Sequence, residues 1–138
     1  EENEKWIAID LGEQLLHAYV GTRLVRVVPC STGIKNNTFE GHYRIQWKRR
    51  IQTMQLKHGH TRVEDVQWVM YYDKARSLAI HTATWHGDFG RKRSHGCVNL
   101  PRDDARWLYE WSSPSPAPED SETFPHSANP GTRVVVFD

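Results

Sequence analysis

Ser94-His95-Gly96-Cys97-Val98-Asn99-Leu100 is the stretch on which the interpretation of this 138-residue chain depends. It places a cysteine two residues after a histidine, and a segment with helical spacing begins directly behind it at Pro101. A second histidine, His81, lies upstream in a short apolar segment. A cysteine together with separate histidines can provide a thiol nucleophile and its base. We therefore expect an enzyme whose nucleophile is Cys97.

The surroundings of Cys97 favour that role chemically. A thiol reacts as the thiolate, and the N-terminus of a following helix favours negative charge. Gly96 lets the backbone come close to a substrate, and the backbone N–H groups from His95 to Cys97 can face a developing oxyanion. The alternative is that Cys97 is only a buried apolar side chain. Composition alone favours that alternative, but the His-Gly-Cys context before a helix favours the nucleophile.

Composition narrows the class of protein. Hydrophobic residues make up 38% of the chain and charged residues 25%, as in a globular domain with a polar surface. We expect a single domain over residues 1–138. The formal net charge of +1 predicts no nucleic-acid partner. No stretch approaches the roughly 20 apolar residues that span a bilayer, and the polar opening of the chain does not resemble a secretory signal.

The chain is expected to be mostly β, a sandwich or barrel of about six to eight strands with one helix beside the cysteine motif. The helix is expected over Pro101 to Ser112, because Ala105, Leu108 and Trp111 form an apolar stripe at helical spacing. Residues 113–131, rich in serine and proline, are expected to form a long, flexible polar loop. Alternation and β-branched residues predict strands at 6–10, 15–20, 24–30, 38–45, 64–72, 77–81 and 132–137.

Two basic runs, Lys48-Arg49-Arg50 and Arg91-Lys92-Arg93, stand out from the mixed charge pattern. Each is expected to be a solvated loop or strand end. Because the second run leads into the cysteine motif, it is also a candidate for binding a substrate that carries carboxylates. The other cysteine, Cys30, ends an apolar strand and is expected to be a small buried residue.

These motifs resemble the catalytic domain of the L,D-transpeptidases, also known as the YkuD domain. The signature of that family is a histidine, a variable loop, and then Ser/Thr-His-Gly-Cys followed by a hydrophobic residue and Asn or Arg. This chain has His81 and then Ser94-His95-Gly96-Cys97-Val98-Asn99. Its opening strands and Cys30-Ser31-Thr32-Gly33 resemble the N-terminal half of the same domain. The resemblance therefore covers nearly the whole chain.

The resemblance implies a role for each residue of the site. Cys97 would be the acyl-forming nucleophile, and His81 would be the general base. The backbone carbonyl of Thr82 would orient that histidine. The oxyanion would lie against the backbone N–H groups around His95 and Gly96. The residues that would contact substrate are Ser94, Asn99 and Arg93.

The same resemblance implies the reaction and its partners. Cys97 would attack a peptidoglycan tetrapeptide stem and release D-alanine. An amine of a second stem would then resolve the thioester and form a 3→3 crosslink in the bacterial cell wall. No cofactor and no metal would take part, and carbapenem-type β-lactams would be inhibitors. The protein would act outside the cytoplasm, as a monomer.

Several alternatives stay open at this point. Water as the acceptor would make the enzyme an L,D-carboxypeptidase or another hydrolase of the same fold. A zinc-binding hydrolase would use His81, His86 and His95, whose imidazoles suit zinc although their spacing matches no zinc motif. A catalytically silent wall-binding module is disfavoured by the intact histidine and cysteine. Finally, His95 competes with His81 as the base, because residues two apart on a strand share a face.

Overall fold

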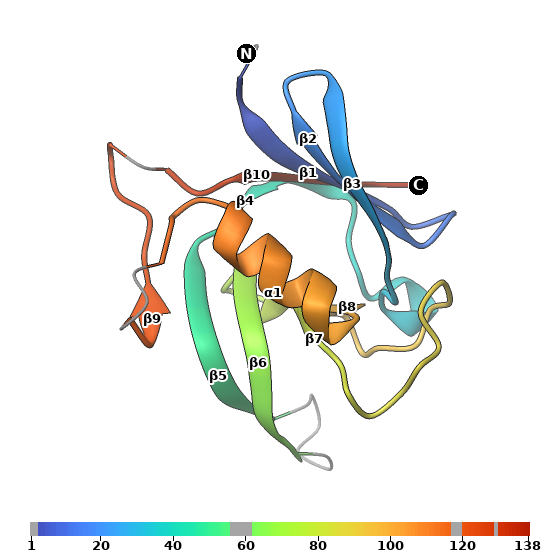
Figure 1. Ribbon diagram of the computed structural model, residues 1–138. Helices are drawn as coiled ribbons and strands as arrows, with labels where there is room; N and C mark the ends of the chain where they lie inside the picture. Colours follow the sequence, from blue (N-terminus) through green and yellow to red (C-terminus); the bar gives the residue numbers. More distant parts are fainter. Residues whose placement is uncertain (1–2, 56–61, 117–119, 129) are drawn as a thin grey trace.

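The computed structural model of the protein describes residues 3–55, 62–116, 120–128 and 130–138 (Figure 1). Within these residues the chain forms two five-stranded sheets and one α-helix, so the mostly β class is confirmed. The elements are β1 (Lys5–Asp10), β2 (Leu15–Val20), β3 (Arg23–Pro29), a short 3-10 helix (Ile34–Asn36), β4 (Gly41–Arg44), β5 (Trp47–Gln55), β6 (Arg62–Asp73), β7 (Leu78–Thr82), β8 (Val98–Leu100), α1 (Arg102–Trp111), β9 (Glu122–Thr123) and β10 (Arg133–Phe137).

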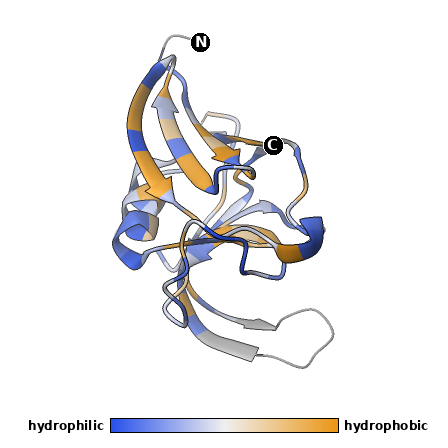
Figure 2. Ribbon diagram, turned by 90° about the vertical axis from the view of Figure 1, so that its right-hand side faces the viewer, coloured by the Kyte–Doolittle hydropathy of each residue, from blue (hydrophilic) through white to orange (hydrophobic). Residues whose placement is uncertain are grey.

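The first sheet has the strand order β3-β2-β1-β10-β4. β1, β2 and β3 form an antiparallel meander, and β10 lies between β1 and β4, parallel to β1. Apolar and polar bands alternate along strands near the N-terminus (Figure 2). Ile7 and Ile9 pair with Val134 and Val136, and all four are buried in the main core. The two ends of the chain therefore meet in the middle of one sheet.

The second sheet has the order β8-β7-β6-β5-β9. β5 and β6 form a long antiparallel hairpin, β7 returns beside β6, and β8 lies parallel to β7. Alternation predicts one buried face for Val66, Trp68, Met70 and Tyr72. The structure keeps the last three in or against the main core but places Val66 in a second cluster. Trp68 has a left-handed φ of 56°, so simple alternation breaks there.

The helix α1 lies against the second sheet, below the strands of the first (Figure 1). Asp103 and Asp104 occupy its first turn, where the helix dipole favours negative charge. Its apolar side packs on β6 and β7 and buries Ala105, Leu108 and Tyr109. The predicted helix is thus confirmed. It covers the main core at β6 and β7. None of the helices in the described part of the chain has the length and hydrophobicity needed to span a bilayer.

The strand β5 contains the basic run Lys48-Arg49-Arg50, which is typical of a solvated segment. The structure corrects that expectation, because Lys48 is fully buried. Its ammonium donates to the carbonyl oxygens of Tyr109 (2.7 Å), Ser112 (2.8 Å) and Pro114 (2.8 Å). Burial and the charge of Lys5 lower the pKa of Lys48 to about 7. Three donors meet three acceptors at the C-terminal end of α1, where positive charge is favoured.

The segment 113–131, which leads from α1 to β10, is predicted to be a flexible loop. Where the structure describes this segment, it contains the short strand β9, which pairs with β5. Glu122 accepts a hydrogen bond from Trp47 Nε1 (2.8 Å), and Phe124 stacks on the Trp47 ring with centroids 6.1 Å apart. The described part of the loop is therefore attached to the second sheet, and its flexibility stays a prediction.

Candidate active site

The parallel strands β7 and β8 bring the two predicted catalytic residues to one face of the second sheet. His81 of β7 pairs with Asn99 of β8, and Cys97, which ends the loop 94–97 (the cysteine loop), directly precedes β8. Paired residues of neighbouring strands share a face, and so do residues two apart on one strand. His81, Asn99 and Cys97 therefore lie on the same side of the sheet. That side is opposite the main core, into which Ile80 packs.

The Ser-Thr-Gly turn after β3 forms backbone hydrogen bonds with the cysteine loop and with β8. Ser31 exchanges two backbone hydrogen bonds with Asn99, at 2.8 and 3.0 Å. Thr32 O accepts from the backbone N–H groups of Arg93 (3.0 Å) and Ser94 (3.1 Å). The turn thereby holds both ends of the cysteine loop, and the two motifs that carry the family resemblance form one structural unit.

Two glycines let this turn and the cysteine loop approach each other. A Cβ on Gly33 would lie 2.9 Å from Gly96 Cα, and a Cβ on Gly96 would lie 3.0 Å from Leu78 Cδ2. Thr38 Oγ1 joins the two glycines, because it accepts from Gly33 N–H (2.7 Å) and donates to Gly96 O (2.6 Å). The φ of Gly96 is 156°, which L side chains rarely adopt, and a Cβ there would also lie 3.2 Å from Asn37 O, so both conformation and space favour glycine before Cys97.

His81 is held as a neutral base. Its Nδ1 lies 2.7 Å from Thr82 O. Because a carbonyl only accepts, Nδ1 carries the proton and Nε2 keeps its lone pair. Burial lowers the pKa of His81 to about 4, and the Thr82 carbonyl acts weakly in the opposite direction. At neutral pH the ring is an unprotonated acceptor that can take a proton at Nε2.

Cys97 is half-buried and packs against a cluster that includes Val69 and Tyr71. Its Sγ lies 3.5 Å from Ser77 O. Burial raises the pKa of Cys97 to about 11, and the backbone of Ala79 lowers it by a smaller amount. The pKa of this thiol therefore lies above its ordinary value. In the free protein at neutral pH the residue is a thiol, which must lose its proton during the reaction.

Ser94 organises the backbone of the cysteine loop. Its hydroxyl donates to Cys97 O and accepts from Gly96 N–H at 3.2 Å. The Gly96 N–H is thereby engaged within the loop. The oxyanion role of the backbone N–H groups from His95 to Cys97 stays a prediction. The Ser94 side chain is buried and makes its bonds inside the loop, and its contact with substrate stays a prediction.

The other predicted residues differ in exposure. Asn99 is almost fully buried, and its side-chain amide lies 3.1 Å from His86 Nε2. Arg93 is exposed, and its guanidinium pairs with the Asp88 carboxylate at 2.7 Å. His95 is also exposed, unlike the buried ring of His81. The structure therefore brings Asn99 to His81 and leaves Arg93 and the His95 side chain on the surface.

No three His, Cys, Asp or Glu side chains of the described segments come together in a way that could hold a metal ion. His81, His86 and His95 of the alternative zinc site do not converge. The ring nitrogens of His86 contact the backbone N–H of Asp88 and the Asn99 amide instead. The zinc alternative therefore has no ligand set in this part of the chain.

An aromatic row crosses the second sheet toward Cys97. Phe124, Trp47 and Tyr71 stack in that order, with ring centroids 6.1 and 4.9 Å apart. Tyr71 belongs to the cluster against which Cys97 packs, and Phe124 is 51% exposed. The sequence pattern does not reveal this row, because its members come from separate segments that only the sheet brings together.

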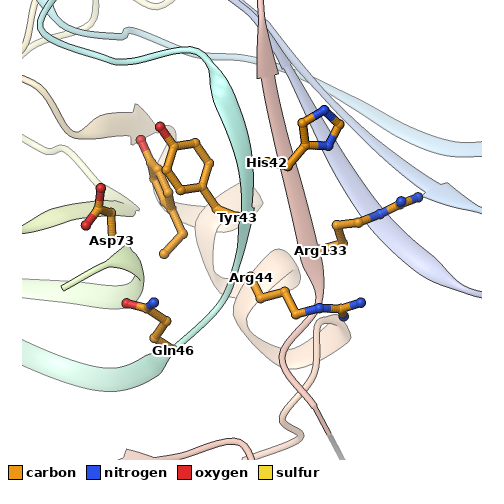
Figure 3. Close-up of a pocket in the computed structure, with 7 residues that line it drawn as sticks. His42, Tyr43, Arg44, Gln46, Asp73 and Arg133 are labelled. Carbon is orange, nitrogen blue, oxygen red and sulfur yellow. The ribbon is translucent and has the colours of Figure 1, made fainter. Parts of the chain in front are cut away.

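A separate hollow of about 400 Å³ lies at β4 and the end of β6 (Figure 3). Figure 3 shows Arg44 and Arg133 on one side of β4 and Asp73 on the other. The charges are already paired, because both guanidinium groups lie near Glu4 (3.9 and 3.4 Å) and Asp73 binds Arg76 (2.7 Å). The candidate catalytic residues do not line this hollow, and we assign no function to it.

The chain matches the family model of the L,D-transpeptidase catalytic domain, YkuD, over residues 4–136. No curated protein matches it significantly. An L,D-transpeptidase from Mycobacterium smegmatis is 21% identical with a TM-score of 0.75, over 98% of this chain and 59% of that chain. One from Enterococcus faecium is 20% identical with a TM-score of 0.77, over 97% of this chain and 50% of that chain. L,D-transpeptidase 3 from Mycobacterium tuberculosis, in complex with a faropenem-derived adduct, is 20% identical with a TM-score of 0.74, over 97% and 60%.

The fold and the site define a class of mostly β domains in which a histidine on one strand and a cysteine just before the adjacent parallel strand share a face of the sheet. The chain belongs to the L,D-transpeptidase catalytic domain family, because the family match covers nearly all of it. The solved structures are distant in sequence and show the same fold. The chain spans 50 to 60% of the length of these three structures.

Proposed function

We propose that this domain is a cysteine-dependent L,D-transpeptidase that acts on the tetrapeptide stems of peptidoglycan. One observation carries the proposal. The Thr82 carbonyl holds His81 with its Nε2 unprotonated, on the same face of the sheet as Cys97. The family of the chain supports the substrate class. A thiol with an imidazole suffices for acyl transfer, so no cofactor is needed.

In the first half of the proposed reaction, Nε2 of His81 takes the proton of the Cys97 thiol. The sulfur attacks the carbonyl carbon that joins the third residue of the stem to its terminal D-alanine. A carbon–sulfur bond forms, and the backbone N–H groups of His95 and Cys97 stabilise the oxyanion. The imidazolium then gives its proton to the leaving nitrogen, the carbon–nitrogen bond breaks, and D-alanine leaves a thioester.

In the second half, the side-chain amine of another stem attacks the thioester. The carbon–sulfur bond breaks, and a new amide joins the third residues of the two stems as a 3→3 crosslink. His81 takes the proton of the amine and returns it to the sulfur of Cys97. When water replaces the amine, the same steps release a tripeptide, which is L,D-carboxypeptidase activity. The acceptor that reaches the thioester therefore decides between the two activities.

Mass spectrometry of the intact protein tests the proposal. Incubation with a tetrapeptide-containing muropeptide should add a tripeptide acyl group to the protein and release D-alanine. Cys97→Ala should carry no adduct, whereas Cys30→Ala should keep it, because Cys30 is a buried thiol outside the site. An adduct on Cys30, or none on the folded parent protein, would overturn the proposal.

The acceptor is tested in the same reaction. With a second stem present, a crosslinked dimer is the product expected of a transpeptidase. If only free tripeptide accumulates although an amine acceptor is present in excess, the protein is a carboxypeptidase.

The proposal extends to inhibitors and to location. Similar structures are described as complexes with imipenem and with a faropenem-derived adduct, and we propose that carbapenems acylate Cys97. We propose that the domain acts outside the cytoplasm, where it would meet a cell-wall substrate. The proposal also takes the domain to act as a monomer. A carbapenem adduct that Cys97→Ala abolishes would support the inhibitor assignment, and an unmodified parent protein would contradict it.

A further inference from the structure

The loop between β7 and β8 carries a histidine, His86, that the proposed reaction does not use. Its Nδ1 accepts a hydrogen bond from the backbone N–H of Asp88 at 3.0 Å. Its Nε2 lies 3.1 Å from the side-chain amide of Asn99. Asn99 is 1% exposed and pairs with His81 in the parallel ladder. His86 therefore connects this loop to the strand beside the base.

The chemistry of the ring determines how His86 and Asn99 interact. A neutral imidazole has one donor and one acceptor. Because Nδ1 accepts from Asp88, Nε2 carries the proton and must donate. Asn99 provides an acceptor when its Oδ1 faces the ring, and that oxygen has no other partner among the described residues. The structure has Asn99 Nδ2 facing Nε2, and two donors cannot bond each other. Turning the amide so that Oδ1 faces the ring gives a bond from His86 Nε2–H to Asn99 Oδ1.

The same loop places a tryptophan against the base. The rings of Trp85 and His81 have centroids 6.0 Å apart, and Trp85 also meets His86 edge-on at 6.3 Å. Trp85 is 47% exposed, whereas His81 is 3% exposed. The indole therefore forms an outer cover of the buried imidazole. A second ring, Phe89, packs on His86 at 5.1 Å and fixes the histidine from the other part of the loop.

We propose that His86 is a positioning residue that, through its bond to Asn99, keeps Trp85 packed over His81. The inference rests on the proposed function for the role of His81 as base. In this arrangement the loop shields His81 from water, so that the base stays unprotonated until substrate arrives. Consistent with this arrangement, burial is the cause of the lowered pKa of His81.

Burial, together with the charged groups around it, leaves the ring of His86 neutral. Asp88 and Arg93 are the charged groups that face it, and they pair with each other at 2.7 Å. Burial and the Arg93 guanidinium lower the pKa of His86, and the Asp88 carboxylate opposes them. The neutral ring that the bond to Asp88 N–H requires is thus the form present at neutral pH.

Two substitutions separate the bonds of His86. His86→Asn keeps an acceptor near the position of Nδ1 but loses the reach to Asn99. His86→Gln places an amide donor near the position of Nε2 and keeps that reach. His42→Asn is the matched control, because it makes the same chemical change at an exposed residue of β4.

The pKa of His81, measured by NMR titration of the ring, is the main readout. We expect it to rise by about one unit or more in His86→Asn, because water reaches the imidazole when the loop is released. It should stay near the parental value in His86→Gln and in His42→Asn. An unchanged pKa in folded His86→Asn, or equal rises in His86→Asn and His86→Gln, would overturn the inference.

The tautomer of His86 in the parent protein provides a test that needs no variant. Its ring nitrogen chemical shifts should report the proton on Nε2, and a proton on Nδ1 would overturn the inference. Acylation by the tetrapeptide donor should fall by about two- to tenfold in His86→Asn and recover in His86→Gln. A parent protein that the donor never acylates would overturn the proposed function, whereas the pKa of His81 would still decide the positioning role of His86.

Discussion

His81 donates its Nδ1–H to the carbonyl oxygen of Thr82, its immediate neighbour in β7, at 2.7 Å. The bond leaves Nε2 as the only ring nitrogen that can take a proton. Burial holds the pKa of His81 at about 4 and that of Cys97 at about 11. The resting site is therefore a neutral imidazole with a neutral thiol, and not an ion pair. This charge state determines how the protein responds to pH.

The rate of alkylation of Cys97 by iodoacetamide should rise about tenfold per pH unit between about pH 6 and 9. Both catalytic pKa values lie outside that window, so the thiolate fraction increases steadily through it. The measurement is made on Cys30→Ala, which leaves one reactive thiol. A plateau above pH 7 would instead indicate a thiolate paired with a protonated histidine.

His81→Ala should lower the single-turnover acylation rate by about 10² to 10⁴, the usual contribution of a general base. His95→Ala should lower it much less, because the His95 side chain is exposed and only its backbone N–H is proposed to act. Rates are compared at saturating donor so that binding does not enter. The reverse order would move the base to His95.

Lys48→Met should destabilise the fold, since three carbonyl oxygens at the end of α1 lose their donor. Each buried group left without a partner costs about 1–3 kcal/mol. Denaturant unfolding measures the loss, with Lys35→Met as an exposed control. If the two variants are equally stable, the hydrogen bonds of Lys48 make no net contribution to the free energy of unfolding.

The stability of the parent protein should also depend on pH through Lys48. The pKa of Lys48 is about 7 in the fold, and an unfolded lysine has a pKa of about 10.4. Between these values the unfolded chain binds more protons, so stability should rise with pH, by at most about 1.4 kcal/mol per unit. The test covers about pH 7 to 8.5, because the raised thiol pKa values act oppositely at higher pH. Lys48→Met should lack this slope.

The basic run before the cysteine loop should contribute to donor binding. Arg93 is engaged by Asp88, and Arg91 and Lys92 are exposed on the same loop. Exposed ion pairs contribute about 0–1 kcal/mol each. Changing all three basic residues to glutamine should therefore weaken donor binding several-fold at low salt and reduce its salt dependence. Parental affinity that is the same at low and physiological salt would show that the run is only solvated.

Limited proteolysis should cut the chain first between Ser115 and Ser127 and leave the two pieces associated. β10 stays paired between β1 and β4, and Phe124 anchors the loop on Trp47. Phe124→Ala should accelerate the cut, because it removes that stacking. Thiol acylation should survive in the nicked protein, since Cys97 and His81 both precede the loop. Resistance across the whole segment would show that it is a packed wall.

Local sequence patterns were sufficient to predict most strands and the helix. Strand alternation predicts β1, β2, β3, β6, β7 and β10, and the apolar stripe predicts α1, because these signals repeat within a few residues. The strands β5, β8 and β9 escape prediction. β5 contains a buried lysine within a basic run, and β8 and β9 have only three and two residues. Such segments become strands only because a partner strand lies beside them.

The sequence by itself determined the chemical groups of the site, a thiol at Cys97 and an imidazole at His81, together with the glycine and helix that flank the thiol. Only the tertiary structure decided how those groups are used. The shared face of His81 and Cys97 comes from the pairing of β7 with β8, and the burial of both residues sets their charge state. The engagement of Gly96 N–H by Ser94 likewise follows from the folded loop. Periodicity carries information over a few residues, whereas the bonds of Lys48 join groups 61 to 66 positions apart. Burial and pairing of that kind exist only after the sheets and the helix have packed together.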